Sequence, residues 1–233
     1  MDLLKLNRQF YLKTQKYFNR SRQFYWEGWK KLLPYLQVRN LQVLDLGCGN
    51  GRFGIWLSGQ RQIDYTGLDN NQYLLNRCRE VLPQAKLINQ DILKPWQVKE
   101  KFDLIVLFGV LHHIPGFNNR LKILRWAKKL LSENGYLIFS LWQLDKSRRL
   151  TRKIVPWPEF LKSSKIKINL KQLEPNDLII DWKSGPTAHR FCHIVDGKEL
   201  KRLLGKLKMI QRQNYFSDGE KGRGNRYLIL RKT

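Results

Sequence analysis

The feature that most constrains the fold is an apolar run that leads into three alternating glycines. Residues 43–46 (Val-Leu-Asp-Leu) have the character of a buried strand end, and Gly47, Gly49 and Gly51 follow it. Glycine has no Cβ, so such a loop lets a ligand come close to the backbone. Residues 52–58 then carry a helical apolar pattern, which places the free amides of the loop at a helix N-terminus. The glycines run G-x-G-x-G without the Lys-Ser/Thr of a P-loop, and this pattern predicts a nucleotide-type cradle.

A carboxylate at the tip of the next predicted strand strengthens this interpretation. Glycines alone also suit a merely structural turn. Residues 63–70 form an apolar strand, and Asp69 lies at its end. In a βαβ unit, a carboxylate at this position accepts hydrogen bonds from ribose hydroxyls. The order of strand, glycine loop, helix, strand and carboxylate therefore favours ligand binding over a simple turn.

The alternation of strands and helices continues along the chain. Further strands are predicted at residues 85–92 and 101–108, a helix at 118–132, and another strand at 136–141. This alternation predicts an α/β fold with a parallel sheet. The strand at 101–108 runs into Gly109 and the pair His112-His113, at the carboxyl edge where open α/β sheets bind ligands.

The flanks of this core have a different character. An amphipathic helix is expected at residues 3–18, laid across the sheet, and a second helix at 24–36. About 45 residues after the strand at 136–141 show no clear element. A stretch of this length is usually a functional lid or a disordered segment, and its tryptophans favour a packed lid over an ordinary insertion. We expect one domain over residues 1–233, with an N-terminal helical lead (1–40), a cofactor-binding core (41–142), a basic lid insertion (143–190) and a C-terminal helix with two strands (191–233).

The formal net charge of +25 is concentrated outside the predicted core. Residues 41–142 carry a net charge of +5, and the other segments together carry +20. A uniform compositional bias would not separate the charge in this way. A basic surface of this kind favours a polyanionic partner, nucleic acid before any other, over a merely solvated surface. The candidate nucleic-acid-binding residues are Arg148, Arg149, Arg152, Lys153, Lys183, Arg223 and Arg226.

The sequence also bears on the compartment. No run approaches the roughly 18 apolar residues of a membrane span, and the N-terminus has no apolar signal region. The cysteines at 48, 78 and 192 are odd in number and scattered, which argues for reduced thiols. We therefore expect a cytoplasmic protein without a membrane association.

The spacing D-x-G-x-G-x-G resembles motif I of the class I methyltransferases, which bind S-adenosylmethionine. The later blocks stand where this family has its second, third, fourth and fifth strands. The resemblance implies a Rossmann-like fold with a seven-stranded, mostly parallel sheet between helices, its last strand antiparallel and a lid inserted after strand five. It also implies a cofactor site formed by Asp45, Gly47, Gly49, Asn50, Gly51, Asp69, Asn70, Asp91, Ile92, Phe108 and Arg22.

The flanks resemble one subfamily, the tRNA wobble-uridine carboxymethyl methyltransferases. The matching blocks are residues 18–22 (Phe-Asn-Arg-Ser-Arg), 25–29 (Tyr-Trp-Glu-Gly-Trp), 111–113 (Leu-His-His), 189–193 (His-Arg-Phe-Cys-His) and 223–230 (Arg-Gly-Asn-Arg-Tyr-Leu-Ile-Leu). This resemblance implies that the chain methyl-esterifies a carboxymethyl group on the wobble uridine in the anticodon region of tRNA. It also implies a small activating partner protein, because the eukaryotic members work with one.

The acceptor determines which side chains the chemistry needs. A carboxylate is already ionised at neutral pH, so its methylation needs no general base but does need a fixed cation or donor. Arg190 is the candidate for this cation, and His112 and His113 are further catalytic candidates. Arg22 is a candidate for the methionine carboxylate of the cofactor. His189, Cys192 and His193 invite a metal interpretation, but no fourth ligand is near them, so no metal is expected.

Two other functions remain open from the sequence. A methyltransferase of a small quinone or lipid precursor shares motif I and the Leu-His-His pattern, but the segregated charge and the block at 189–193 argue against it. A non-catalytic RNA-binding protein could keep the fold, but it would be free to lose the intact acidic residues and glycines of the cofactor site.

Overall fold

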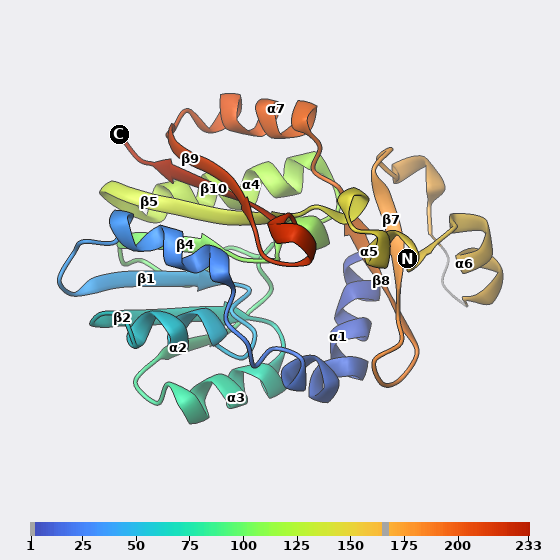
Figure 1. Ribbon diagram of the computed structural model, residues 1–233, viewed down its shortest axis with the longest axis horizontal. Helices are drawn as coiled ribbons and strands as arrows, with labels where there is room; N and C mark the ends of the chain where they lie inside the picture. Colours follow the sequence, from blue (N-terminus) through green and yellow to red (C-terminus); the bar gives the residue numbers. More distant parts are fainter. Residues whose placement is uncertain (1–2, 165–167) are drawn as a thin grey trace.

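The computed structural model describes residues 3–164 and 168–233, and its centre is a seven-stranded sheet (Figure 1). The strand order is β3-β2-β1-β4-β5-β10-β9. Strands β1 to β5 are mutually parallel, and β10 is antiparallel to both of its neighbours. The predicted class I methyltransferase fold is thereby confirmed. The bounds are β1 (Leu41–Leu46), β2 (Ile63–Asp69), β3 (Lys86–Asn89), β4 (Phe102–Leu107), β5 (Leu131–Trp142), β9 (Ile210–Ser217) and β10 (Asn225–Arg231).

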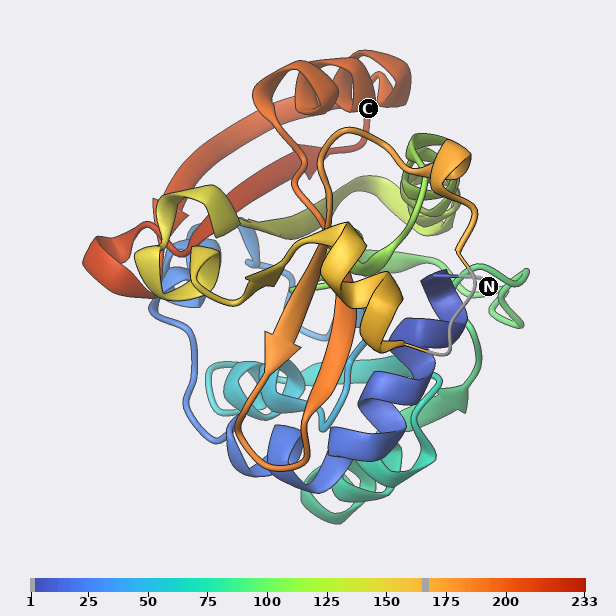
Figure 2. The same cartoon turned by 90° about the vertical axis from the view of Figure 1, so that its right-hand side faces the viewer.

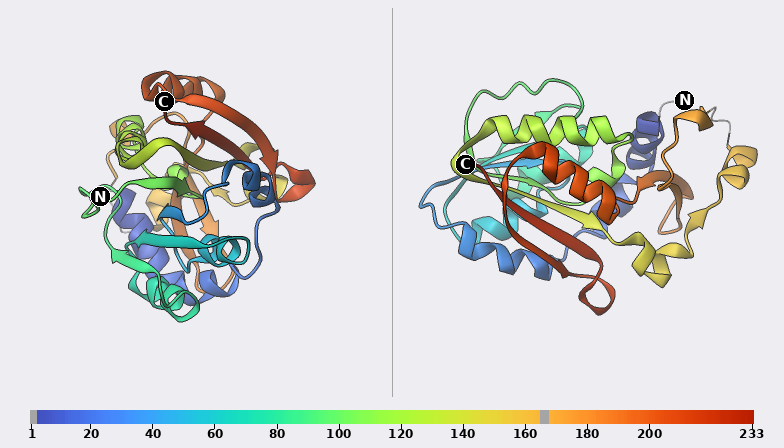
Figure 3. Two further views of the ribbon diagram at one scale, coloured as in Figure 1. Left: turned by 90° about the vertical axis from the view of Figure 1, so that its left-hand side faces the viewer. Right: turned by 90° about the horizontal axis from the view of Figure 1, so that it is seen from above.

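Helices cover both faces of this sheet, so its central strands are buried on both sides. In β4, Leu104 and Val106 belong to one apolar cluster and Ile105 and Leu107 to the other. Near-continuous apolar runs of this kind are the signature of such two-sided burial. One face packs against η1 (Glu27–Tyr35), α2 (Arg52–Ser58) and α3 (Gln72–Val81), and the other against α4 (Phe117–Leu130) and α7 (Gly197–Leu207), which lie side by side (Figure 3).

The insertion forms a second sheet, which corrects the expectation of a stretch without clear elements. Its three strands are antiparallel in the order β6-β7-β8, at one end of the main sheet (Figure 2). The expected boundary between residues 190 and 191 falls inside β8. Short helices accompany the strands, so the bounds are η3 (Leu144–Lys146), α5 (Arg148–Thr151), β6 (Ile154–Val155), α6 (Trp157–Ser163), η4 (Leu170–Gln172), β7 (Asp177–Trp182) and β8 (Ala188–His193).

The first helix, α1 (Leu3–Arg20), packs against this second sheet and not across the main one as expected (Figure 2). Its buried Leu3 and Leu6 join a cluster with Phe160 and Phe191. The amphipathic pattern predicts that this helix has a buried face, but not which of two sheets covers it.

The second segment of the lead also differs from its prediction. Residues 24–36 were expected to form a helix, and the structure has a helix there that is shorter, at Glu27–Tyr35, and of the 3₁₀ type, with Pro34 inside it. Proline has no N–H and disfavours an α-helical residue before it, which explains the tighter, shorter helix. The connection from β9 to β10 contains the 3₁₀ helix η5 (Glu220–Gly222).

Candidate active site

A cavity opens at the carboxyl ends of β1, β2 and β4, where open α/β sheets bind ligands. The glycine loop forms one wall. Gly47 and Gly49 both have positive φ angles, of 77° and 56°. A Cβ on Gly47 would lie 2.6 Å from Cγ2 of Val110, whereas a Cβ on Gly49 would meet only Leu74, at 4.0 Å. Packing therefore requires glycine at position 47. At Gly49, which lines the cavity, the place where a Cβ would lie is open space.

Two predicted carboxylates line this cavity. Asp45 is buried and accepts a hydrogen bond from the Tyr65 hydroxyl at 2.7 Å. Burial raises the pKa of the Asp45 carboxyl to about 7, against the opposing effect of that hydrogen bond. Asp69 accepts hydrogen bonds from the amides of Gly49 and Asn71, both at 2.9 Å. Asp69 thus fixes the glycine loop from the neighbouring strand while standing at the cavity wall.

The other predicted cofactor residues divide into two groups. Asn50, Asn70, Ile92, Phe108 and Arg22 line the cavity. Gly51 and Asp91 do not line it. Gly51 caps α2, and a Cβ on it would overlap Sγ of Cys78. The Asp91 carboxylate instead accepts a hydrogen bond from the Leu93 amide at 2.9 Å.

Several lining residues were missed in the sequence. Tyr11 and Phe18 come from α1, and Trp142 comes from the end of β5. No local pattern marks them, because their role depends on how α1 and the second sheet pack against the core. Arg52 follows the last glycine of the loop directly, so its position alone could have suggested it.

Arg190 lies in β8 inside a box of aromatic rings. Its guanidinium carbon lies 5.2 Å from the ring centre of Phe10, 4.6 Å from Trp142 and 5.7 Å from Trp182. The side chain is only 4% exposed, and Nε and Nη1 have no hydrogen-bond partner among the residues that the structure describes. Ring faces attract a cation, but burying an unpaired charge remains costly. Arg190 does not itself line the cavity, but Trp142, which it contacts, does.

The two predicted catalytic histidines have different surroundings. His113 lines the cavity, and its Nδ1 lies 3.1 Å from the Phe191 carbonyl oxygen. His112 does not line the cavity, and its ring stacks on Trp142 with the centres 4.1 Å apart. Burial, with a contribution from Arg190, lowers the pKa of His113 to about 3, and burial lowers the pKa of His112 well below its ordinary value. Both imidazoles are therefore neutral and weakly basic at physiological pH.

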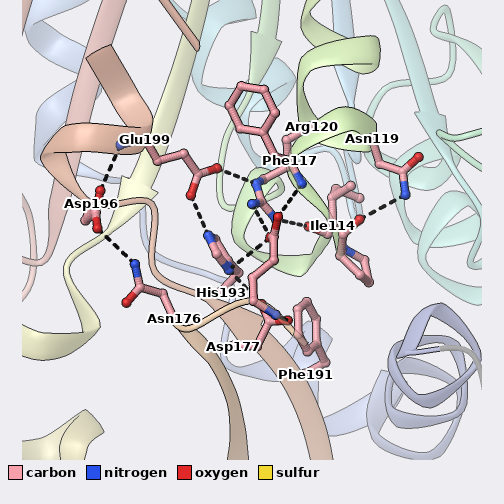
Figure 4. A network of polar contacts seen from close by, with 12 residues as sticks. Ile114, Phe117, Asn119, Arg120, Asn176, Asp177, Phe191, His193, Asp196 and Glu199 are labelled. Carbon is pink, nitrogen blue, oxygen red and sulfur yellow. Dashed lines mark hydrogen bonds and ion pairs between the residues drawn. The ribbon is translucent and has the colours of Figure 1, made fainter. Parts of the chain in front are cut away.

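Of the three residues that invite a metal interpretation in the sequence, His193 belongs to a network of ion pairs (Figure 4). His193 contacts Asp177 at 2.7 Å and Glu199 at 2.6 Å, and Glu199 also binds Arg120 at 2.7 Å. Arg120 is fully buried and pairs with Glu174 at 2.5 Å as well. His189, by contrast, packs edge-on against Phe160. We refer to Arg120, Glu174, Asp177, His193 and Glu199 as the His193 network, which joins α4, the second sheet and α7.

A family model described as a methyltransferase domain matches residues 17–207 of the chain. The chain belongs to this methyltransferase family. A tRNA (carboxymethyluridine(34)-5-O)-methyltransferase of Xenopus tropicalis is 23% identical over 259 residues, which cover 93% of this chain and 39% of the relative. The protein of the same name from Saccharomyces cerevisiae is 26% identical over 175 residues, which cover 71% of this chain and 60% of the relative. This methyltransferase chain therefore spans less than two thirds of the length of these curated relatives.

The magnesium protoporphyrin IX methyltransferase of Synechocystis, solved with bound S-adenosylmethionine, shares the fold. It superposes with a TM-score of 0.63 at 15% identity, covering 100% of this chain and 98% of that one. The cofactor of the methyltransferase is S-adenosyl-L-methionine. The open space beside Gly49 and the lining carboxylates Asp45 and Asp69 fit such a ligand, which carries a sulfonium, an ammonium and ribose hydroxyls.

The basic residues predicted to bind nucleic acid are spread over several elements of the methyltransferase. Arg148, Arg152 and Arg223 are exposed, and the connection that carries Arg223 bonds to the start of the insertion, from the Gln143 amide to the Gly224 carbonyl. Lys183 is exposed beside Asp181, Lys153 is half-buried, and Arg226 donates to Asn214 at 2.9 Å. The side chain of Arg149 lies outside the described part of the structure. No helix in the described ranges is long and apolar enough to cross a bilayer.

Proposed function

We propose that this methyltransferase esterifies the carboxylate of a carboxymethyl group on the wobble uridine of tRNA. The observation that carries the proposal is Arg190, a buried guanidinium with two unpartnered nitrogens beside the cavity wall. Such a group is best stabilised by an anion that arrives with the substrate. The printed names of the curated relatives, which specify carboxymethyluridine in tRNA, support the same acceptor.

The proposed mechanism requires little acid–base chemistry from the protein side chains. When bound beside the glycine loop and Asp69, S-adenosylmethionine would supply an electrophilic methyl group to a carboxylate oxygen by in-line displacement, with S-adenosylhomocysteine as the leaving group. Arg190 holds the acceptor carboxylate, and the glycine loop with Asp69 holds the donor side of the cavity. Alignment of the two reactants is the main contribution to the rate. The weak basicity of His113 fits this reaction, because an ionised carboxylate needs no proton removed.

Binding of tRNA draws on the positive charge outside the core. In the proposal, Arg148, Arg152 and Arg223 contact phosphates, and base recognition occurs at the cavity. The three cysteines are buried free thiols, which supports the expectation of a reducing, cytoplasmic compartment. The small activating partner implied by the resemblance enters the proposal as a component whose effect on activity is to be measured.

The test is transfer of labelled methyl groups from S-adenosylmethionine to defined acceptors. Total tRNA that lacks the final methyl ester, isolated small carboxylic acids and quinone precursors are offered separately, each with and without a candidate partner protein. We expect label on tRNA, lost on mild alkaline hydrolysis as expected of an ester, and mass spectrometry to locate it on the wobble nucleoside. Label on a small molecule and none on tRNA would replace the proposal with the small-molecule alternative.

A further inference from the structure

His113 has one ring nitrogen whose role neither the fold nor the proposed function explains. Its Nδ1 lies 3.1 Å from the Phe191 carbonyl oxygen, which can only accept a hydrogen bond. The proton of the neutral ring therefore lies on Nδ1, and Nε2 carries a lone pair. The Cys192 thiol is more distant from Nδ1, at 3.7 Å, and a thiol is too weak a donor to reverse this tautomer.

The surrounding contacts keep this tautomer in place. Asn7 in α1 donates to the Phe191 carbonyl and to the His113 carbonyl, both at 3.1 Å, and accepts from the Phe191 amide at 2.8 Å. Asn7 is itself buried. One amide side chain thus fixes β8 against the segment that carries His113, so that neither the ring nor the carbonyl it binds is free to reorient.

Protonation does not change the role of Nε2 in the working pH range. Burial and the nearby positive charge of Arg190 hold the pKa of His113 at about 3. Nε2 is buried and has no hydrogen-bond partner among the residues of the described ranges. A buried acceptor without a donor is unfavourable, and such groups in native proteins call for an explanation.

The position of the ring suggests what supplies the missing donor. His113 lines the cavity, and its ring lies 5.5 Å from that of Trp142, the same ring that the Arg190 guanidinium covers at 4.6 Å. An acceptor lone pair and an unpaired cation therefore share one aromatic partner at one end of the site. The complementary ligand carries a carboxylate and, on the same unit, an N–H donor.

We propose that His113 is a specificity-determining residue whose Nε2 accepts a hydrogen bond from the imide N–H of a uracil ring. The inference rests on the proposed function and adds to it, because it names the part of the base that is recognised. Uracil presents a donor at its ring N3, flanked by carbonyls, whereas cytosine presents an acceptor there. A cytosine would set two lone pairs against each other in a buried site, and would be rejected.

The test compares two acceptors of the same length and sequence. One is an anticodon stem-loop RNA with 5-carboxymethyluridine at the wobble position, and the other carries 5-carboxymethylcytidine there. For the wild-type protein we expect kcat/KM to favour the uridine by roughly 10- to 100-fold, the value of one well-placed hydrogen bond lost to an unpaired buried group. His113→Phe keeps an aromatic ring without the lone pair, and it should bring the ratio close to one.

Three further measurements make the outcome specific. His112→Phe changes the neighbouring buried imidazole, which does not line the cavity, and should keep the wild-type ratio whatever it does to the rate. His113→Gln, whose side-chain carbonyl can accept a hydrogen bond, should restore part of the ratio. The ratio should also stay flat from about pH 5.5 to 8, since the ordinary titration of histidine near 6.5 is absent. Thermal denaturation and cofactor binding of each variant establish that it is folded.

Failure of the inference and of the proposed function are distinguishable. If neither RNA is methylated by folded, cofactor-binding protein, either alone or with the candidate partner protein, the proposed function is wrong. If the uridine RNA is methylated but His113→Phe retains the wild-type preference, Nε2 does not read the base and the inference is overturned. The same conclusion follows if the wild-type ratio is close to one.

Discussion

Arg190 is the side chain on which the proposed function depends most. Its guanidinium packs among three aromatic rings from α1, β5 and β7, and two of its nitrogens have no partner in the described part of the protein. A planar guanidinium stacks on such rings and presents a fork to a carboxylate, which an ammonium cannot do. A lysine has the same charge but cannot replace the arginine in this arrangement.

We therefore expect Arg190→Lys to leave the enzyme poorly active although the charge is kept. Arg190→Ala should lower kcat/KM by roughly 10- to 1000-fold, the cost of one positioned, charge-assisted contact, while cofactor affinity is retained. Steady-state kinetics on unmethylated tRNA at two salt concentrations provide the measurement. If Arg190 only meets phosphates, Lys will substitute well and the loss will shrink at low salt. Full activity of Arg190→Lys would show that Arg190 does not orient the acceptor carboxylate.

Asp69 offers a second test of a single residue, on the cofactor side of the cavity. Its carboxylate accepts hydrogen bonds from Gly49 and Asn71 and lines the cavity, so Asp69→Ala removes both the predicted ribose contacts and a support of the loop. Each hydrogen bond to a charged group contributes about 1.5–3 kcal/mol, so affinity for S-adenosylmethionine should fall at least tenfold. Calorimetry measures this directly, with Asp64→Ala, on the exposed side of the same strand, as the matched control. Unchanged affinity in Asp69→Ala would refute the assignment.

At the scale of elements, the second sheet is joined to the core by two sets of buried polar contacts. Asn7 binds β8 from α1, and the His193 network binds β7 and β8 to α4 and α7 (Figure 4). Arg190 and His193 lie in the same strand, so the network holds the strand that carries Arg190, the residue proposed to bind the acceptor carboxylate. The attachment of the insertion therefore includes buried polar contacts that depend on charge.

This attachment should give the protein a pH-dependent stability. Burial disfavours the charged form of His193, but hydrogen bonds to Asp177 and Glu199 outweigh it and raise the pKa of His193. Because the pKa is higher in the folded state, protonated His193 contributes its full amount to the free energy of unfolding below the unfolded-state pKa of about 6.5. This contribution is lost as the pH rises through the folded-state pKa of His193. Urea denaturation at several pH values should show a decline in the free energy of unfolding over this window.

Two matched variants test whether His193 causes this decline in the free energy of unfolding. His193→Gln should be less stable at low pH and should lack the decline. His189→Gln, on the same strand but packed against Phe160, should keep it. A wild-type decline that persists unchanged in His193→Gln would assign the pH dependence to other groups.

At the scale of the whole molecule, we expect the charge distribution to govern the proposed binding of tRNA. Net charge outside residues 41–142 is +20, and part of it lies on α5 and on the connection between β9 and β10, near the start of the insertion. Binding of tRNA should weaken with salt at a slope of about −0.7 to −0.9 in log K per neutralised phosphate. Fluorescence titrations over a salt series measure this slope.

Replacing Arg148 and Arg152 together by Gln should reduce the slope by roughly one to two units, if each makes a phosphate contact. Lys101→Gln is the control, because Lys101 precedes β4 at the opposite edge of the sheet from the cavity. A flat salt response of the wild type would contradict binding of a polyanion at these surfaces and would favour a small-molecule substrate.

The features that could be predicted from the sequence are those that depend on residues close together along the chain. The strand before Gly47, the glycine loop and Asp69 at the end of β2 were predictable, because apolar periodicity and backbone freedom act over a few residues. The fold class followed from their order, since alternating strands and helices allow few arrangements.

Contacts between residues that are far apart in the sequence could be identified only from the folded structure. The aromatic box of Arg190 joins Phe10, Trp142 and Trp182, and no local pattern relates these positions. The sheet that covers α1 was mispredicted for this reason. The Asp91 carboxylate accepts a hydrogen bond from the Leu93 amide, two residues further along the chain, and Asp91 does not line the cavity. A periodic pattern states that a face is buried, but the surface that buries it is selected by packing over the whole chain, and the orphaned nitrogens of Arg190 and His113 exist only once that packing is complete.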